Sequence, residues 1–136
     1  MAEAKAQAAR QVPRPLSPHL QIYRMTWTMA MSVFHRGTGV ALYAGTALVA
    51  AWLLAMASGP AAYDRVSWLY GSPIGLLVLF GYTWALTHHM LGGIRHLAWD
   101  TGVGFEPGTR MMMARMTLIG SVTLTVLIWL VAYLVR

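Results

Sequence analysis

The chain contains no cysteine and only four acidic residues among its 136 positions. The absence of cysteine excludes disulfide bonds, iron–sulfur clusters held by thiolates, and covalent haem attachment through a Cys-x-x-Cys-His motif. Charged residues of either sign make up 10% of the sequence, whereas soluble domains average about 25%. Hydrophobic residues account for 57%. This composition is typical of an integral membrane protein.

The few charges are mostly positive, since ten Lys and Arg residues give a net charge of +6. In a soluble protein such an excess would suggest nucleic-acid binding. Here the basic residues lie at the ends of apolar segments, where positive charge orients membrane proteins and binds anionic lipid head groups. We therefore expect contact with a lipid membrane and no nucleic-acid partner.

Three stretches are long and apolar enough to cross a bilayer, which takes about 20 residues. They run roughly over residues 31–57, 72–99 and 113–135. Ser72 can cap the second helix, and Pro73 suits its first position. The predicted fold is an all-α integral membrane protein with three transmembrane helices in residues 31–136. Residues 1–30 are expected to form a cytoplasmic N-terminal and interfacial segment.

The distribution of Lys and Arg predicts the orientation of these helices. Basic residues cluster before the first span and around the second loop, whereas Asp64 and Arg65 cancel in the first loop. The positive-inside rule therefore predicts that the N-terminus and the second loop are cytoplasmic, and that Arg136 faces the other side. The first 24 residues lack the apolar core of a secretory signal. We expect a bacterial inner membrane in preference to a mitochondrial one.

His89 lies inside the second apolar span, where an ionisable side chain is costly without a partner. A metal is the partner that suits a neutral imidazole, and without cysteine a haem has to be held noncovalently. His96 lies two helical turns further, about 10 Å along the same face, whereas His88 is about 100° away. Gly92 and Gly93 lie between and would let a porphyrin approach the backbone. A hydrogen bond between helices or a water-filled cavity remains an alternative.

A second group of polar residues opens the first span. Ser32 and Arg36 are four positions apart and share a helix face, with His35 beside them. A hydroxyl and a guanidinium at this place can bind a carbonyl oxygen and stabilise negative charge as that oxygen is reduced. A haem propionate or a lipid phosphate is an equally suitable ligand. The predicted topology puts these residues at the same membrane face as Arg95 and His96, which favours one anionic site.

Three helices enclose a haem poorly, so we expect a partner membrane subunit. The segments RPLSPHLQIYR, SVFHRGTGVAL and HMLGGIRHLAWD resemble the cytochrome b membrane-anchor subunits of succinate dehydrogenase, respiratory complex II. The resemblance covers nearly all of the chain after about residue 13. It implies that the chain is half of a heterodimeric bundle, in which a second three-helix anchor subunit supplies the other axial histidine of one haem b.

The resemblance also implies roles for individual residues. The axial histidine of the family precedes G-I-R-H by three intervening residues, which corresponds to His89 in this chain. Ser32 and Arg36 correspond to residues that line the ubiquinone site. His35, Arg36 and His96 correspond to residues near the haem propionates.

The function implied is electron transfer, and the chain would not be catalytic alone. A flavoprotein subunit would oxidise succinate, an iron–sulfur subunit would carry the electrons, and ubiquinone would be reduced near this chain. The alternatives are a structural anchor without cofactor and a fumarate reductase anchor, which runs electrons the other way. A half-transporter is disfavoured because the third span offers only Ser and Thr, which can bond to their own backbone.

Overall fold

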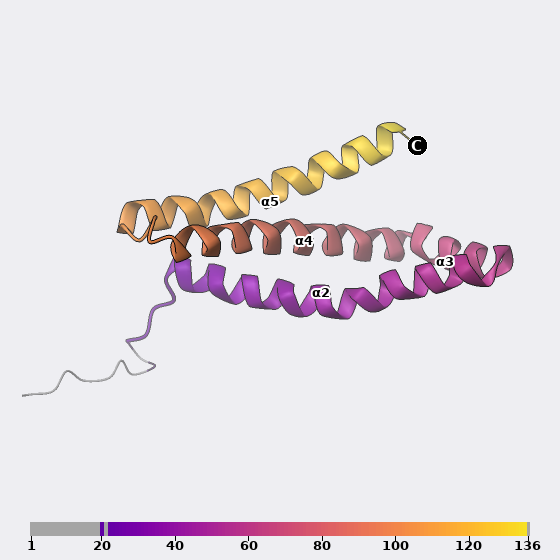
Figure 1. Ribbon diagram of the computed structural model, residues 1–136, viewed down its shortest axis with the longest axis horizontal. Helices are drawn as coiled ribbons and strands as arrows, with labels where there is room; N and C mark the ends of the chain where they lie inside the picture. The colour runs from indigo at the N-terminus through magenta and orange to yellow at the C-terminus, as the bar shows by residue number, and fades with distance from the viewer. Residues whose placement is uncertain (1–19, 21, 136) are drawn as a thin grey trace, which may run out of the picture.

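The computed structural model describes residue 20 and residues 22–135, and most of these residues lie in four helices (Figure 1). Helix α2 spans Trp27–Ser58, α3 spans Pro60–Gly71, α4 spans Pro73–Asp100 and α5 spans Pro107–Val135. Helices α2, α4 and α5 are each long and apolar enough to cross a membrane. The predicted all-α fold with three membrane-spanning helices is therefore confirmed. The RPLSPH part of the N-terminal motif and Arg136 lie outside the described residues.

Local sequence signals explain where these helices begin. Thr26 caps α2, with its hydroxyl accepting a hydrogen bond from the Met29 amide at 3.4 Å. Ser72 caps α4 by accepting from the Gly75 amide at 3.1 Å, and Pro73 follows at the first helical position, as predicted. Each cap provides an acceptor for one of the backbone amides that a helix start leaves without a partner.

Helix α3 differs from the sequence prediction, which places a loop at residues 58–71 between two spans. Gly59 ends α2 with a φ of 107°, a backbone conformation that glycine adopts without steric cost. Pro60 then starts a helix of 12 residues, which is too short to cross a bilayer. None of its residues is buried, and Trp68 is 77% exposed. This helix has the length and the aromatic surface of an interfacial segment.

The helices also extend beyond their apolar segments. The predicted start of the third span, Met113, falls inside α5, which begins at Pro107. Polar residues such as Arg110 continue the helix, since the Arg110 amide donates to the Glu106 carbonyl at 2.8 Å. Hydropathy therefore located the membrane-crossing part of this element, whereas the helix itself depends on backbone hydrogen bonds that polar residues form equally well.

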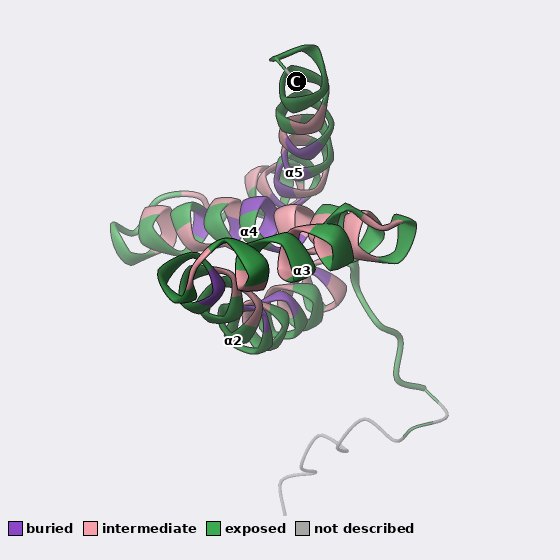
Figure 2. Cartoon of the chain, turned by 90° about the vertical axis from the view of Figure 1, so that its right-hand side faces the viewer, coloured by how far each residue is buried: buried purple, intermediate pink, exposed green. Residues whose placement is uncertain are grey.

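Helix α4 lies between α2 and α5, and α5 diverges from it toward the C-terminus (Figure 1). Buried positions occur where α4 meets its neighbours, and exposed positions cover the outer faces (Figure 2). The contact between α4 and α5 includes several hydroxyl-bearing side chains: the Thr87 hydroxyl oxygen lies 2.9 Å from that of Thr125, and the Trp129 indole donates to the Thr83 hydroxyl at 3.2 Å. Membrane helices pack through such residues because lipid provides no hydrophobic force between them.

The contact between α2 and α4 has a different character, in which aromatic rings fit against glycines. A Cβ atom added at Gly45 of α2 would overlap the Tyr82 ring of α4. One added at Gly39 would lie 3.0 Å from Cε1 of His89. In the reverse direction, a Cβ at Gly92 of α4 would collide with the ring of His35 on α2. These three contacts hold the two antiparallel helices close together, and two of them involve candidate site residues.

Candidate functional site

The two neighbouring histidines of α4 face different helices. His88 lies against α5, with its Nδ1 atom 3.1 Å from the Ser121 hydroxyl. His89 faces α2, with its Nδ1 atom 3.1 Å from the backbone carbonyl oxygen of His35. The helical geometry predicted this separation, because consecutive residues point about 100° apart around a helix.

The environment of His89 determines which of its nitrogens carries a proton. A carbonyl oxygen can only accept, so the Nδ1 atom that faces the His35 carbonyl has to donate. The Thr38 hydroxyl oxygen lies 3.4 Å from the same nitrogen. With the proton on Nδ1, the lone pair of the neutral ring is on Nε2. This is the tautomer that binds a metal through Nε2.

Three histidines form one cluster on the α2 and α4 helices, namely His35, His89 and His96. The rings of His35 and His89 are stacked, with centroids 4.0 Å apart and planes 7° from parallel. The His96 ring lies 5.1 Å from that of His35. His89 is half-buried and His96 is exposed, so the cluster extends from the helix contact toward the surface. The expectation that His89 and His96 share a face agrees with this geometry.

Gly92 and Gly93 differ in a way that the sequence did not indicate. Both were expected to give a porphyrin access to the helix backbone. Gly92 is buried and receives the ring of His35, whereas nothing lies within 4 Å of a Cβ placed on Gly93. The role of Gly92 in this structure is therefore helix packing, and of the two only Gly93 leaves open space.

Ser32 and Arg36 lie on the first turns of α2, one turn apart on the same side. Ser32 is half-buried and Arg36 is exposed. Among the described residues, neither side chain hydrogen-bonds to the histidine cluster. A half-buried hydroxyl and an exposed guanidinium are thus available beside His35, with no side-chain hydrogen bond to another described residue.

His88 is fully enclosed by this chain, with no exposed surface. The Phe34 and Trp84 rings pack against its imidazole at centroid distances of 6.3 and 5.2 Å. Its Nε2 atom is buried, without a hydrogen-bond partner among the described residues. His88 therefore packs α4 against α5 and presents no exposed surface to a ligand, whereas His89 is only half-buried.

Arg95 departs from the expected grouping of basic residues at one anionic site. Its side chain is only 5% exposed and faces α5, where Nη1 donates to the Thr117 hydroxyl at 3.4 Å. The guanidinium carbon lies 5.1 Å from the centroid of the Trp99 ring, within range of a cation–π contact. The single anionic site predicted from the topology is corrected accordingly, since His35 and His96 come together and Arg95 points to the other neighbouring helix.

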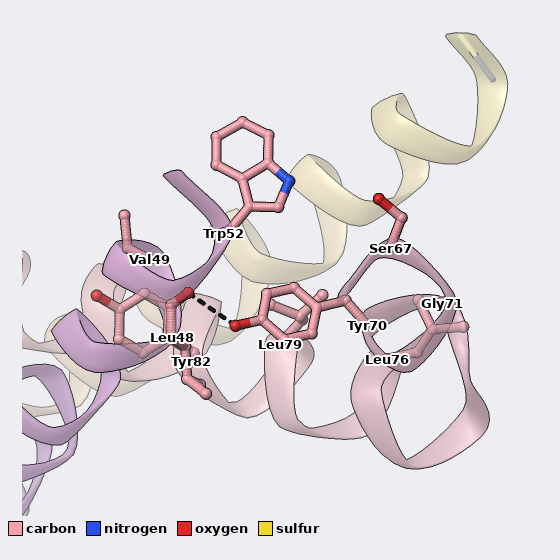
Figure 3. A pocket seen from close by; sticks show the side chains of 9 residues that line it. All are labelled: Leu48, Val49, Trp52, Ser67, Tyr70, Gly71, Leu76, Leu79 and Tyr82. Carbon is pink, nitrogen blue, oxygen red and sulfur yellow. Dashed lines mark hydrogen bonds between the residues drawn. The ribbon is translucent and has the colours of Figure 1, made fainter. Parts of the chain in front are cut away.

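A cavity of about 570 Å³ lies at the other end of the bundle, where α2, α3 and α4 meet (Figure 3). Tyr70 and Leu48 both line this cavity, and the Tyr70 hydroxyl donates to the Leu48 carbonyl at 2.7 Å. Tyr82 also lines the cavity, but none of the candidate site residues does. The cavity and the histidine cluster are therefore separate features of the molecule.

Comparison with known proteins identifies the family. Residues 10–128 match the model of the succinate dehydrogenase/fumarate reductase transmembrane subunit. The chain belongs to this family. The chain is 41% identical over 120 residues to the succinate dehydrogenase cytochrome b556 subunit of Paracoccus denitrificans, covering 88% of this chain and 92% of that one.

Two further relatives point to the same branch of the succinate dehydrogenase/fumarate reductase transmembrane subunits. The cytochrome b556 subunit of Rickettsia felis is 34% identical over 119 residues, 85% of this chain and 90% of its own. The mitochondrial cytochrome b560 subunit of Sus scrofa is 42% identical over 93 residues, 67% of this chain and 55% of its own. The resemblance to succinate dehydrogenase cytochrome b subunits is confirmed, and the chain is a multi-pass membrane anchor subunit of complex II.

Proposed function

We propose that this subunit transfers electrons within a succinate:ubiquinone oxidoreductase, by holding haem b through His89 and forming part of the site where ubiquinone is reduced. The observation that carries the proposal is the hydrogen bond from His89 Nδ1 to the His35 carbonyl, 3.1 Å long. It leaves Nε2 free as a donor atom, which is how metal-binding histidines are commonly oriented. The relatives support the cofactor, since they are named cytochrome b556 and b560 subunits.

The residues present fit a haem. His89 is half-buried at the outer edge of the contact between α2 and α4, and Gly93 leaves open space one helical turn away. A haem b held there would supply a site that takes up and releases one electron at a time. His89 would hold the iron, and His35 and His96, which lie on the cytoplasmic side of His89 in the predicted topology, would bind the propionates.

A partner is required to complete this site. The three spans leave most of their apolar surface exposed, and α5 diverges from the bundle (Figure 2). A second three-helix anchor subunit packed against the α2 and α4 face would supply the other axial histidine. The chain contains no cysteine for iron–sulfur clusters, and we assign the delivery of electrons to an iron–sulfur subunit and, before it, a flavoprotein subunit.

Ser32 and Arg36 are the residues we assign to ubiquinone. Both lie on the first turns of α2, next to His35, and both are free of hydrogen bonds to other described side chains. The guanidinium of Arg36 can stabilise negative charge on the quinone oxygen, and the Ser32 hydroxyl can donate a hydrogen bond to it. With this assignment, the quinone would bind at the same end of the bundle as the histidine cluster.

The membrane is proposed to be a bacterial inner membrane, with the N-terminus in the cytoplasm. The start of α2 and the loop between α4 and α5 lie at the same end of the bundle (Figure 1). Arg24, Arg36, Arg110 and Arg115 flank the spans at this end, as the positive-inside rule requires of a cytoplasmic face.

A reduced-minus-oxidised optical spectrum of the purified complex tests the proposal. We expect a b-type band in the wild type, its loss in His89→Leu, and its retention in the adjacent control His88→Leu. Loss of the band in the His88 variant alone would assign the iron to the other imidazole. A colourless wild-type complex would reduce the chain to a structural anchor.

The direction of electron flow is a separate question, because the matching family model covers both succinate dehydrogenase and fumarate reductase subunits. The relatives from Paracoccus denitrificans, Rickettsia felis and Sus scrofa are named for succinate dehydrogenase, which supports succinate oxidation. Rates of succinate oxidation with ubiquinone and of fumarate reduction with a reduced low-potential quinone, measured on the same complex, distinguish the two.

A further inference from the structure

The Thr38 hydroxyl lies at the point where α2 meets the imidazole of His89. Thr38 is 5% exposed, and its Oγ1 atom donates to the His35 carbonyl at 2.9 Å. The same oxygen lies 3.4 Å from Nδ1 of His89. A hydroxyl has one proton and two lone pairs. While the Thr38 hydroxyl donates its hydrogen bond to the His35 carbonyl, its oxygen can still accept one from the His89 Nδ1–H group.

We propose that Thr38 is a positioning residue for the haem ligand, which acts through His89 and does not touch the haem. The Nδ1–H group faces two oxygen acceptors, the His35 carbonyl at 3.1 Å and the Thr38 hydroxyl at 3.4 Å. Acceptors on this nitrogen fix the ring orientation and raise its electron donation at Nε2. The inference rests on the proposed function, because it requires His89 to bind iron.

Two other contacts of His89 do not involve the Thr38 hydroxyl, so the effect of the hydroxyl can be tested separately from them. The His35 ring stacks on the imidazole at 4.0 Å, and the backbone at Gly39 approaches it so closely that a Cβ there would be 3.0 Å away. Replacing the hydroxyl of Thr38 by a methyl group leaves both contacts in place. The expected consequence is a change in the electronic properties and ring angle of the ligand, with the fold retained.

The test is redox titration and electron paramagnetic resonance of the purified complex carrying Thr38→Val. Loss of one acceptor weakens electron donation to the iron, which disfavours the ferric state. We expect a rise in the haem midpoint potential that changes the ferrous-to-ferric ratio at most about fivefold, which is the limit reached if the whole net energy of one hydrogen bond is present in the ferric state only. This corresponds to about 40 mV, at about 59 mV per tenfold for one electron. The low-spin g values should change as well, because they depend on the ring orientation.

Two matched variants control for the substitution itself. Thr46→Val removes the same kind of hydroxyl from the same helix, where it bonds only to the Tyr43 carbonyl at 2.6 Å and is exposed. Thr38→Ser retains the hydroxyl. Both are expected to keep the wild-type potential and g values. The proposal is overturned when Thr38→Val is indistinguishable from the wild type and from Thr46→Val.

The outcomes also separate this inference from the proposed function. A wild-type complex without a b-type band refutes the haem assignment and, with it, the role of Thr38. A wild type with haem and an unshifted Thr38→Val refutes the positioning role alone. If Thr38→Val loses its haem, Thr38→Ala is measured in its place. Loss of haem in both variants with retention in Thr38→Ser supports the role of the Thr38 hydroxyl. Loss of haem in Thr38→Ser as well contradicts that role.

Discussion

Substituting Gly45 by alanine tests whether the glycine-to-ring contacts hold α2 and α4 together. Gly45 is buried, and an added Cβ would overlap the Tyr82 ring. Overpacking of this kind costs about 1–3 kcal/mol. The higher helix propensity of alanine offsets about 1 kcal/mol of this cost. We therefore expect Gly45→Ala to lower the free energy of unfolding by about 0–2 kcal/mol relative to the wild type.

Gly81→Ala is the matched control, because Gly81 is exposed on α4 and nothing lies within 4 Å of its Cβ position. It carries the same propensity gain without the clash, so the two variants should differ by the overpacking cost of about 1–3 kcal/mol. The measurement is loss of helical circular dichroism as SDS is titrated into the detergent-purified complex. The haem band, monitored in the same titration, reports when the histidine cluster opens.

A double-mutant cycle decides whether the Tyr82 ring is responsible. Tyr82→Ala removes the ring that Gly45→Ala would strike, so the double variant should be more stable than the sum of the two single effects. The expected coupling is similar in size to the overpacking cost. Strictly additive effects, or a Gly45→Ala variant as stable as Gly81→Ala, would refute the role of this contact.

Four further substitutions address the site. Gly92→Ala should displace the His35 ring from its stack on His89 and lower the haem content, which the b-type absorbance per subunit measures; undiminished haem would contradict the packing role. His88→Ala should lower stability by about 2 kcal/mol or more, through lost packing and a lost hydrogen bond to Ser121, while the haem band persists. Ser32→Ala and Arg36→Ala should slow ubiquinone reduction at least tenfold, the usual scale for removing one stabilising group, and leave succinate oxidation by an artificial acceptor intact. Unchanged quinone turnover in both would move the quinone site elsewhere.

The fold was largely predictable because a lipid bilayer restricts the segments that can cross it to a few simple features. A span has to be long, apolar and helical, so the runs around residues 31–57, 72–99 and 113–135 were visible in the sequence. Helix α3 was missed because its residues, including Asp64 and Arg65, are mixed in polarity. Such a segment can be a loop or an interfacial helix, and the start at Gly59 and Pro60 distinguishes them only once the backbone is known.

The candidate site was predictable in part. The spacing of His89 and His96 along one helix defines their shared face, and the adjacent His88 has to point elsewhere. The orientation of Arg95 and the difference between Gly92 and Gly93 depend on which helix lies on each side of α4. Hydropathy does not specify that arrangement, because none of the three spans has a strongly marked polar face.

Thr38 illustrates a signal that was present but not interpretable beforehand. A threonine within an apolar span ordinarily bonds to its own backbone, and Thr38 does so through the His35 carbonyl. Its proximity to His89 arises from the pairing of α2 with α4, across 51 positions of sequence. Without knowledge of how α2 pairs with α4, the sequence does not distinguish Thr38 from Thr46, whose hydroxyl makes a similar bond to a backbone carbonyl.

The stacked histidines follow from the antiparallel course of the two helices. His35 and Gly39 are one turn apart on α2, and His89 and Gly92 are one turn apart on α4. Because the helices run in opposite directions, each ring reaches the glycine of the other helix, and the two rings pass each other in contact. The motifs on the first and second spans are therefore two halves of one interlocking contact. Moving either histidine by one position would separate it from its glycine and from its neighbour, so the spacing within each motif is a requirement of the pair.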